Sequence, residues 1–409
     1  MNICYVYQDQ FPWDIRVDKF LEVFNDAGFT TNVVSRNRTG LPILEGYLEH
    51  VFIHRLSQGF GKVSKWFVNF PAFFSPFWLG KIVRVASTSR AQVIIVRDLP
   101  MSPSAIFAGK ILKIPVFIDM AENYPAMLED TWKFRGPKLM DYLIRNPVVF
   151  RRLEKWVVGH VDGIIVVSDE SRNRVLSLLR ENGGLPIWII ENTPRLQRTA
   201  GGMQHPIIEG FRKKSGLRLL YVGGMEPSRG LDTVLKAISH LKKRNFPIHF
   251  IIVGEGESRE ALMAQSRILG VEGDVEFTGY IDQKHIPSII NSCDVCIIPH
   301  YVSEHTDTTI PNKIYDYMAQ GKAIVSTQAK TLRRIVEETN CGYTYKDKDE
   351  IELAECLLKL SDSGKRIELG GNGQQSVLRR FNWDWDKQIL LGAMCHAKEY
   401  QLRTRGRVL

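Results

Sequence analysis

The stretch LRLLYVGGMEPSRGLDTVLKA (217–237) contains the pattern on which the fold assignment rests. Its apolar start predicts a buried strand, two glycines follow, and a helix is predicted from Leu231. Glycines at a strand end let a ligand approach the backbone closely. Arg229, just before the helix, favours a phosphate at this position. The alternative is a tight turn next to a solvated arginine.

The same alternation of strand and helix extends in both directions from this stretch. Apolar strands separated by amphipathic helices are typical of parallel sheets that are covered on both faces. The sequence therefore predicts an α/β chain with two tandem Rossmann-like domains facing across a cleft. Strands are predicted at residues 2–7, 30–35, 51–56, 91–98, 115–120, 162–169, 186–194, 217–224, 247–257, 275–281, 294–300, 323–328 and 342–346.

One weakly patterned segment separates the two runs of strands. It contains adjacent glycines, a proline and a basic cluster, which are typical of an interdomain linker. The predicted boundaries are residues 1–198 for the first domain, 199–216 for the linker, 217–385 for the second domain and 386–409 for a C-terminal helix.

Composition limits the classes of protein to which the chain can belong. The 409 residues are 44% apolar and 24% charged, which is typical of globular domains, and the net charge of +9 favours anionic partners. Six cysteines are too few for a disulfide scaffold and indicate reduced thiols. For the Cys293/Cys296 pair we expect burial rather than a metal or redox site. We expect neither a signal peptide nor a transmembrane helix.

A second pattern, HTDTTIPNKIYDYMAQGKAIVS (305–326), combines a hydroxyl-rich loop with a helix that is predicted to open at Pro311. Free backbone N–H groups of a first helical turn attract anions, and Lys313 adds a cation there. Asp316, one turn further on, could accept two hydrogen bonds from a ribose diol. The alternative for Asp316 is an exposed acid stabilised by the helix dipole.

Taken in order, these patterns carry a family resemblance. The second domain, over most of 217–385, resembles the donor domain of GT-B-fold glycosyltransferases, and most of all the retaining enzymes of glycosyltransferase family 4. In the first domain, FIDMAENYP (117–125) resembles the family's D-x-H-E segment. FNWDW (381–385) resembles the motif before the helix that crosses back to the first domain. The motifs of the second domain are VGGMEPSRGLDTVLKA, IIVGEGE, FTGYI, DVCIIP and PNKIYDYMAQGKAIVS.

The resemblance implies roles for individual residues. Gly223 and Gly224 would let a nucleotide diphosphate lie against the backbone, Arg229 and Lys313 would bind the diphosphate, and Asp316 would bind the ribose. Gly279 would contact the base through its backbone. The other implied nucleotide-binding positions are Gly254, Glu255, Tyr280, Ile281, Thr308, Thr309, Ile310, Pro311 and Asn312.

The chain departs from the family pattern at three positions. Thr308 stands where the family has its first motif acid, although Asp307 is adjacent. Gly224 replaces a family arginine. Ala121 replaces the histidine of D-x-H-E, while Asp119 and Glu122 are kept and could orient the acceptor hydroxyl or cap a strand end. The candidate catalytic residues are Asp316, Arg229, Lys313, Asp307 and Glu122.

The resemblance implies transfer of a sugar from a nucleotide diphosphate sugar, with UDP expected, to a glycan acceptor with retention of configuration. Cations and helix-start amides can stabilise the departing diphosphate, so neither a metal nor another cofactor is expected. Two alternatives remain open: an epimerase of the same fold that acts on nucleotide sugars, or a catalytically inactive partner subunit.

Two segments of the first domain bear on the acceptor. Residues 60–84 combine eight aromatic side chains with flanking lysines and an arginine, and residues 133–155 carry seven basic against two acidic side chains. We expect a lipid-linked acceptor and an anionic membrane surface as partners, hence a cytoplasmic protein peripheral on the inner face of the plasma membrane. The alternatives are a buried helix and a solvated helix face. Because nucleic-acid motifs are missing, no nucleic-acid partner is expected.

Overall fold

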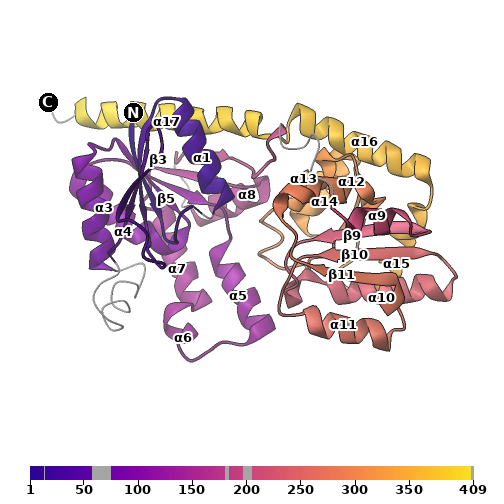
Figure 1. Cartoon of the computed structure of the whole chain (residues 1–409). Coiled ribbons are helices and arrows are strands. Elements are labelled where there is room, and N and C mark those ends of the chain that lie inside the picture. Colours follow the sequence, from indigo (N-terminus) through magenta and orange to yellow (C-terminus); the bar gives the residue numbers. More distant parts are fainter. Residues whose placement is uncertain (13, 58–74, 180–183, 197–204, 407–409) are drawn as a thin grey trace. The chain divides into compact units, whose positions relative to one another are not determined.

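The computed structural model describes residues 1–409 except residues 13, 58–74, 180–183, 197–204 and 407–409. Contacts divide the chain into two compact units (Figure 1). Unit 1 comprises Met1–Glu191 and Asp386–Leu409, and unit 2 comprises Asn192–Trp385. Each unit has its own sheet between helices. The predicted α/β class with two tandem Rossmann-like domains is therefore confirmed.

Unit 1 contains an eight-stranded sheet in the order β3-β4-β2-β1-β5-β6-β7-β8. All pairs are parallel except the β3–β4 pair. The strands are β1 (Asn2–Tyr7), β2 (Thr30–Ser35), β3 (Leu44–Leu48), β4 (Val51–Arg55), β5 (Val93–Arg97), β6 (Val116–Met120), β7 (Gly163–Val166) and β8 (Ile187–Ile189).

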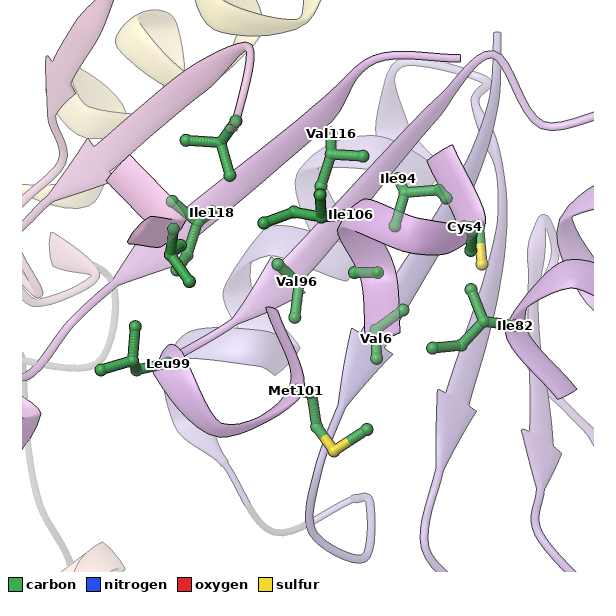
Figure 2. Close-up of a cluster of buried hydrophobic side chains, with 14 of the residues drawn as sticks. Cys4, Val6, Ile82, Ile94, Val96, Leu99, Met101, Ile106, Val116 and Ile118 are labelled. Carbon is green, nitrogen blue, oxygen red and sulfur yellow. The ribbon is translucent and has the colours of Figure 1, made fainter. Parts of the chain in front are cut away.

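The two faces of this sheet are covered by different helices. Val6, Val96 and Ile118 pack against Ile82 and Ile106 from two helices of one layer (Figure 2). Successive strand side chains point to opposite faces, so the other face is left for the first and last helices of the unit. The helices and 3-10 turns are α1 (Ile15–Asp26), α3 (Pro76–Thr88), η2 (Leu99–Met101), α4 (Ser102–Leu112), α5 (Tyr124–Arg135), α6 (Asp141–Ile144), α7 (Pro147–Val158), α8 (Asp169–Leu178) and α17 (Trp383–Gly406).

Unit 2 contains a six-stranded, fully parallel sheet in the order β11-β10-β9-β12-β13-β14. Its central strands are buried on both faces, as continuous Val- and Ile-rich runs predict. The strands are β9 (Leu217–Val222), β10 (Ile248–Val253), β11 (Val275–Gly279), β12 (Val295–Ile298), β13 (Ala323–Thr327) and β14 (Gly342–Tyr345).

Two separate cores lie on the two faces of the unit 2 sheet. One packs Leu219 and Ile252 against Val234 and Leu357, and the other packs Leu220 and Ile251 against further helices. The carboxyl ends of the strands are left for loops and short helices. The helices and 3-10 turns are α9 (Ile207–Arg212), η4 (Pro227–Arg229), α10 (Leu231–Lys243), α11 (Arg259–Ile268), η5 (Glu272–Asp274), η6 (Gln283–His285), α12 (Ile286–Ser292), α13 (Lys313–Ala319), α14 (Lys330–Thr339), α15 (Glu350–Lys359) and α16 (Ser363–Arg379).

The segment predicted as a linker is only partly described. Within residues 205–216, α9 forms, and its Ile208 and Phe211 side chains are buried in the unit 2 core. The sequence did not indicate this helix because it is short and has two apolar anchors. At the other end of unit 2, α17 begins at Trp383 and continues into unit 1, where Leu390 and Met394 are buried.

Candidate functional site

Two glycine turns lie at the carboxyl ends of neighbouring strands in unit 2. Gly223 follows β9 with φ 144°, and Gly254 follows β10 with φ 135°. The amide of Gly223 donates to Val253 O and that of Gly254 to Gly279 O, each at 2.9 Å. A Cβ on Gly254 would collide with Gly223 O. Only glycine therefore lets the ends of β9, β10 and β11 form one continuous backbone edge.

Two cations meet a histidine next to this edge. Lys313 Nζ lies 3.2 Å from His300 Nε2, and Arg229 Nη1 lies 3.3 Å from His300 Nδ1. Lys313 Nζ also sits over the Tyr221 ring, 4.1 Å from its centroid. A Cβ at Gly223 would come within 2.6 Å of the same Nζ, so the glycine turn and the lysine face each other. The residues come from β9, η4, the end of β12 and the start of α13.

The basic side chains of this cluster lie in a desolvated position. Burial lowers the pKa of Lys313 well below its ordinary value, Arg229 lowers it further, and Glu226 opposes the shift. Burial also lowers the pKa of His300, helped by Lys313 and Arg229. Glu226 Oε2 pairs with Arg229 Nε at 3.0 Å. One carboxylate faces two basic side chains here, which leaves a place suited to an anion.

The loop before α13 differs from its expected arrangement. The helix begins at Lys313 rather than Pro311, and the amides of Ile314 and Tyr315 already donate to the carbonyls of Pro311 and Asn312. The helix-start amides expected to face a ligand are therefore partly used within the turn. Ile310 packs partly buried against the second unit 2 core. Cation side chains, not amides, dominate this part of the site.

Hydroxyl and acid side chains of this loop have local partners. Thr308 Oγ1 donates to Glu304 O at 2.9 Å, and Thr309 Oγ1 donates to His305 O at 2.7 Å. Asp307 Oδ1 accepts from the Lys330 amide at 2.9 Å, at the start of α14. Asp307 is the candidate substitute for the first acid of the family motif. In the structure its carboxylate binds the start of α14. Asp316 lies exposed in the first turn of α13.

The predicted base-binding residues are split between surface and core. Tyr280 is 79% exposed and offers its ring to a planar ligand, whereas Ile281 is buried in the second core of unit 2. Glu255 is exposed in the turn after β10, and Gly279 ends β11 with φ 78°. Gly224 accepts a hydrogen bond from Tyr221 Oη at 2.7 Å through its carbonyl.

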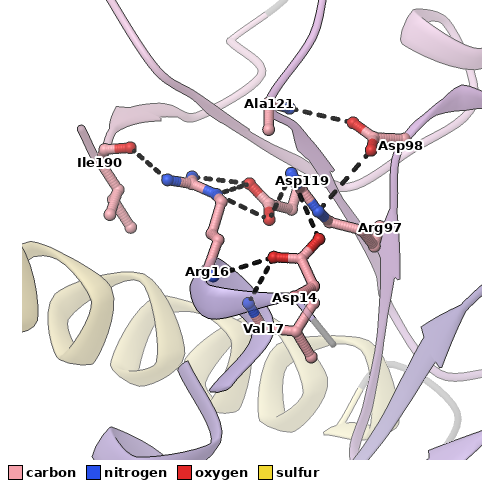
Figure 3. Close-up of polar contacts among 8 residues, drawn as sticks. All are labelled: Asp14, Arg16, Val17, Arg97, Asp98, Asp119, Ala121 and Ile190. Atoms are coloured by element: carbon pink, nitrogen blue, oxygen red, sulfur yellow. Dashed lines mark hydrogen bonds and ion pairs between the residues drawn. The ribbon is translucent and has the colours of Figure 1, made fainter. Parts of the chain in front are cut away.

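Unit 1 contains a buried polar network at the ends of β5 and β6 (Figure 3). Asp119 is fully buried and pairs with Arg16 at 2.7 Å and with Arg97 at 3.4 Å. Arg97 also reaches Asp14 at 3.4 Å. Asp119, considered as an acceptor-orienting residue, therefore joins α1, β5 and β6. Glu122, three residues later, is partly exposed.

Asp98 is a feature of this network that the sequence did not indicate. It has φ 59° and ψ 171°, a backbone conformation that non-glycine residues rarely adopt. Its Oδ1 accepts from the amide of Ala121 at 3.2 Å, next to the position where the family histidine is missing. Burial raises the pKa of Asp98 to about 7, assisted by Asp119, Glu122 and Asp14 and opposed by Arg97.

A protruding element in unit 1 exposes apolar and basic side chains together. The α5 and α7 helices pack on each other, and Figure 1 shows α6 at the end of this pair far from the sheet. Leu139 is 85% and Leu143 71% exposed, with Met140, Tyr142 and Val148 also exposed. We call residues 139–149 the α6 tip. In the predicted aromatic segment, Trp78 is buried and Phe77 exposed, whereas residues 60–74 lie outside the described part.

In the described residues, the features that would indicate a metal site or a membrane span are missing. In that part of the chain, no group of three or more His, Cys, Asp or Glu side chains is placed to hold a metal ion. Cys293 and Cys296 are buried with their sulfur atoms 3.4 Å apart. None of the described helices is long and apolar enough to cross a bilayer.

Comparison with known proteins relates part of unit 2 to one family. Residues 216–363 match the family model described as "Glycosyl transferases group 1". The phosphatidyl-myo-inositol mannosyltransferase of Mycolicibacterium smegmatis is 27% identical over 180 residues, which are 44% of each chain. The chain spans less than half the length of this and the other first curated relatives that it matches.

Two solved structures share the fold over nearly the whole chain. Sucrose-phosphate synthase from Thermosynechococcus elongatus has a TM-score of 0.73 at 16% identity and covers 98% of this chain and 99% of its own. The Anabaena protein HepE, solved in complex with UDP, has a TM-score of 0.70 at 14% identity and covers 97% and 100%. The chain therefore has the GT-B fold, and its residues 216–363 resemble the glycosyl transferases group 1 family.

Proposed function

We propose that this protein is a glycosyltransferase that binds a nucleotide diphosphate sugar in unit 2 and transfers the sugar to a glycan. The observation that carries the proposal is the pair of cations, Arg229 and Lys313, on His300 next to the glycine turn at Gly223. A diphosphate lying against Gly223 and Gly254 would meet both cations. Tyr280 then offers its exposed ring to the base, and Asp316 its exposed carboxylate to the ribose.

The same geometry indicates how the reaction is accelerated. The diphosphate leaving group gains negative charge as its bond to the sugar breaks, so cations placed at that charge stabilise the transition state more than the bound donor. Arg229 and Lys313 are held in place before a ligand arrives, which spares reorganisation at the moment of reaction. We propose that this stabilisation proceeds without a metal ion. Retention of configuration and UDP as the nucleotide are proposed from the resemblance to retaining enzymes and from the UDP bound to HepE.

The acceptor is proposed to be a lipid-linked glycan at an anionic membrane surface. The α6 tip supports this, because its exposed leucines lie between the exposed basic residues Lys138 and Arg145, which suits insertion into the headgroup region of an acidic bilayer. The mannosyltransferase relative is named for a lipid acceptor, which agrees with this choice. We propose a role in assembly of a polysaccharide or glycoconjugate, with the protein peripheral on the inner face of the plasma membrane.

The proposal is tested by thermal-shift titration of the full chain with UDP, GDP, ADP and their glucose conjugates. We expect stabilisation by one nucleotide family, UDP first, and its loss in Arg229→Ala and Lys313→Ala. Lys213→Gln, at an exposed position on the C-terminal side of α9, is the matched control and should keep the shift. No shift with any nucleotide would reject the donor site.

Product analysis then separates transfer from the alternatives. Incubation of the stabilising nucleotide sugar with lipid-linked glycan should release the nucleoside diphosphate and extend the glycan. NMR of the new linkage should show the anomeric configuration of the donor. An epimerised sugar formed without acceptor would indicate an epimerase, and binding without any product would indicate an inactive partner subunit.

A further inference from the structure

His300 is placed between two cations with both of its ring nitrogens engaged. It follows β12 and is 3% exposed. Its Nδ1 faces Arg229 Nη1 at 3.3 Å and its Nε2 faces Lys313 Nζ at 3.2 Å. A neutral imidazole has one hydrogen-bond donor and one acceptor, so its two nitrogens cannot both accept. Arg229 and Lys313 therefore cannot both donate to the ring. One of them must have a lone pair that accepts from the ring N–H.

The assignment of protons follows from the chemistry of the three groups. The Arg229 guanidinium carries only donors and does not lose its proton in proteins, so Nδ1 must be the acceptor. The ring proton is then on Nε2 and points to Lys313 Nζ. This contact is a hydrogen bond only if the lysine amine has a lone pair. The geometry of the ligand-free protein thus fits a neutral Lys313.

The surroundings of the lysine agree with this assignment. Across the described residues, no carboxylate lies within ion-pairing distance of Lys313 Nζ. Glu226, on the loop before η4, is paired with Arg229 instead. The Tyr221 ring of β9 packs beneath Nζ, and His305, on the loop after β12, adds to the positive potential at His300. Burial is the main cause of the lowered pKa of Lys313, and this lowered pKa also favours the neutral amine.

We propose that His300 positions Arg229 and Lys313 for a nucleotide diphosphate and that binding of the diphosphate is coupled to uptake of one proton by Lys313. This inference rests on the proposed donor site. The diphosphate oxygens supply the missing acceptors and negative charge, so an N–H bond forms at Nζ with a proton taken from solvent. The resulting ammonium no longer accepts from His300 Nε2–H and donates to the diphosphate instead, and no group is oxidised or reduced.

The sign of the pH dependence follows from the lysine. Between its lowered pKa in the free protein and its higher pKa in the complex, each pH unit of increase should weaken diphosphate binding about tenfold. The terminal phosphate of UDP has its last ionisation near pH 6, so measurements with UDP above about pH 7.5 exclude titration of the ligand. Affinity should therefore fall as pH rises through the alkaline range.

Isothermal titration calorimetry of the full chain tests the coupling. UDP is titrated at pH 8 in two buffers with different ionisation enthalpies, and the difference in binding enthalpy gives the protons taken up. We expect about one proton per ligand. Lys313→Gln should lower the uptake to near zero while a weak binding signal persists, and Lys213→Gln should leave it unchanged.

The role of His300 is tested by a pair of variants. His300→Gln keeps an amide oxygen that can accept from Arg229 and an N–H that can donate to Lys313, so UDP affinity should stay within a few-fold. His300→Leu removes both contacts and should weaken UDP binding at least tenfold. Melting curves check that both variants fold, and the wild-type calorimetry is decisive even if one does not.

The outcomes separate this inference from the proposed function. UDP binding with no proton uptake in the wild type, or an uptake unchanged in Lys313→Gln, would overturn the inference and leave the donor site standing. Equal affinities for His300→Gln and His300→Leu would overturn the positioning role. If neither UDP nor any other nucleotide binds at pH 7.5, the donor site itself is wrong.

Discussion

At the scale of single residues, Lys313 shows how a binding site costs stability. A lysine amine that is desolvated beside an arginine is unfavourable in the free protein. We expect Lys313→Met to raise the free energy of unfolding of the ligand-free chain by about 1–2 kcal/mol while it abolishes nucleotide binding. Chemical denaturation of both proteins without ligand measures the change. Lys213→Met, on the surface, should stay within about 0.5 kcal/mol; a destabilised Lys313→Met protein would contradict the prediction.

Ionisation of the Asp98 carboxyl makes the stability of the folded protein depend on pH. Its pKa is raised to about 7 in the folded state from an ordinary 3.8, so ionisation opposes folding. Its contribution to stability is complete below about pH 4 and is lost as pH rises towards 7, at up to about 1.4 kcal/mol per pH unit.

The test is the difference between wild type and Asp98→Asn. The asparagine oxygen keeps the bond from the Ala121 amide and does not ionise. We expect the variant to gain stability relative to wild type between pH 4 and pH 7 in urea denaturation curves. Parallel stability curves for the two proteins over this range would show that Asp98 does not titrate there.

At the scale of elements, the turn after β10 depends on its glycine. A Cβ at Gly254 would collide with Gly223 O, and φ is 135°. We expect Gly254→Ala to cost about 2–4 kcal/mol and to weaken nucleotide binding, because the turn must move. Gly273→Ala is the matched control, since its added Cβ would meet nothing within 4 Å. Equal melting temperatures for the two variants would contradict the close approach of the two turns.

The α6 tip is the element that a membrane would contact. We expect Leu139→Asp combined with Leu143→Asp to reduce binding to phosphatidylglycerol vesicles at least tenfold, because two exposed apolar anchors are lost and negative charge is added. Co-sedimentation at low and high salt measures the binding. Ile268→Asp, equally exposed on α11 of unit 2, controls for loss of any surface apolar group. Vesicle binding that survives the double substitution would assign the contact elsewhere.

Elements differ in how well their sequence predicts them. β5, β6, β10 and β12 are fully buried and rich in Val and Ile, and such a largely apolar stretch is a strong local signal. The edge strand β3, LEGYL, is partly exposed and pairs antiparallel, so it carries no such signal. The start of α13 was predicted two residues early, because Pro311 forms a turn that precedes the helix.

The site residues follow the same division between local and long-range information. Gly223 and Gly254 were predictable because a backbone turn leaves a glycine in the sequence. The contact of His300 with Arg229 and Lys313 was not, since it joins residues that are 71 and 13 positions apart. Similarly, Asp119 could not be recognised as a buried partner of Arg16, 103 positions away, before the sheet order was known. Such contacts depend on the order of the strands in the sheet, which a local sequence pattern does not reveal.

At the scale of the whole molecule, the two units have separate cores, while the chain passes from one to the other through α17. We expect calorimetry to show two unfolding transitions. UDP should raise the midpoint temperature of only the transition that belongs to unit 2. At a UDP concentration one hundred times its Kd, the stabilisation should be about 2.7 kcal/mol.

A substitution in α17 shows which unfolding transition belongs to unit 1. Met394 is buried in unit 1, so Met394→Asp places a charge in that core and should cost more than about 3 kcal/mol. We expect it to lower the transition that UDP does not move and to leave UDP binding intact. Cys395→Asp, at the exposed neighbouring position, should leave both transitions in place. If Met394→Asp instead lowered the UDP-responsive transition, residues after Asp386 would stabilise unit 2, and the division of the chain would have to be redrawn.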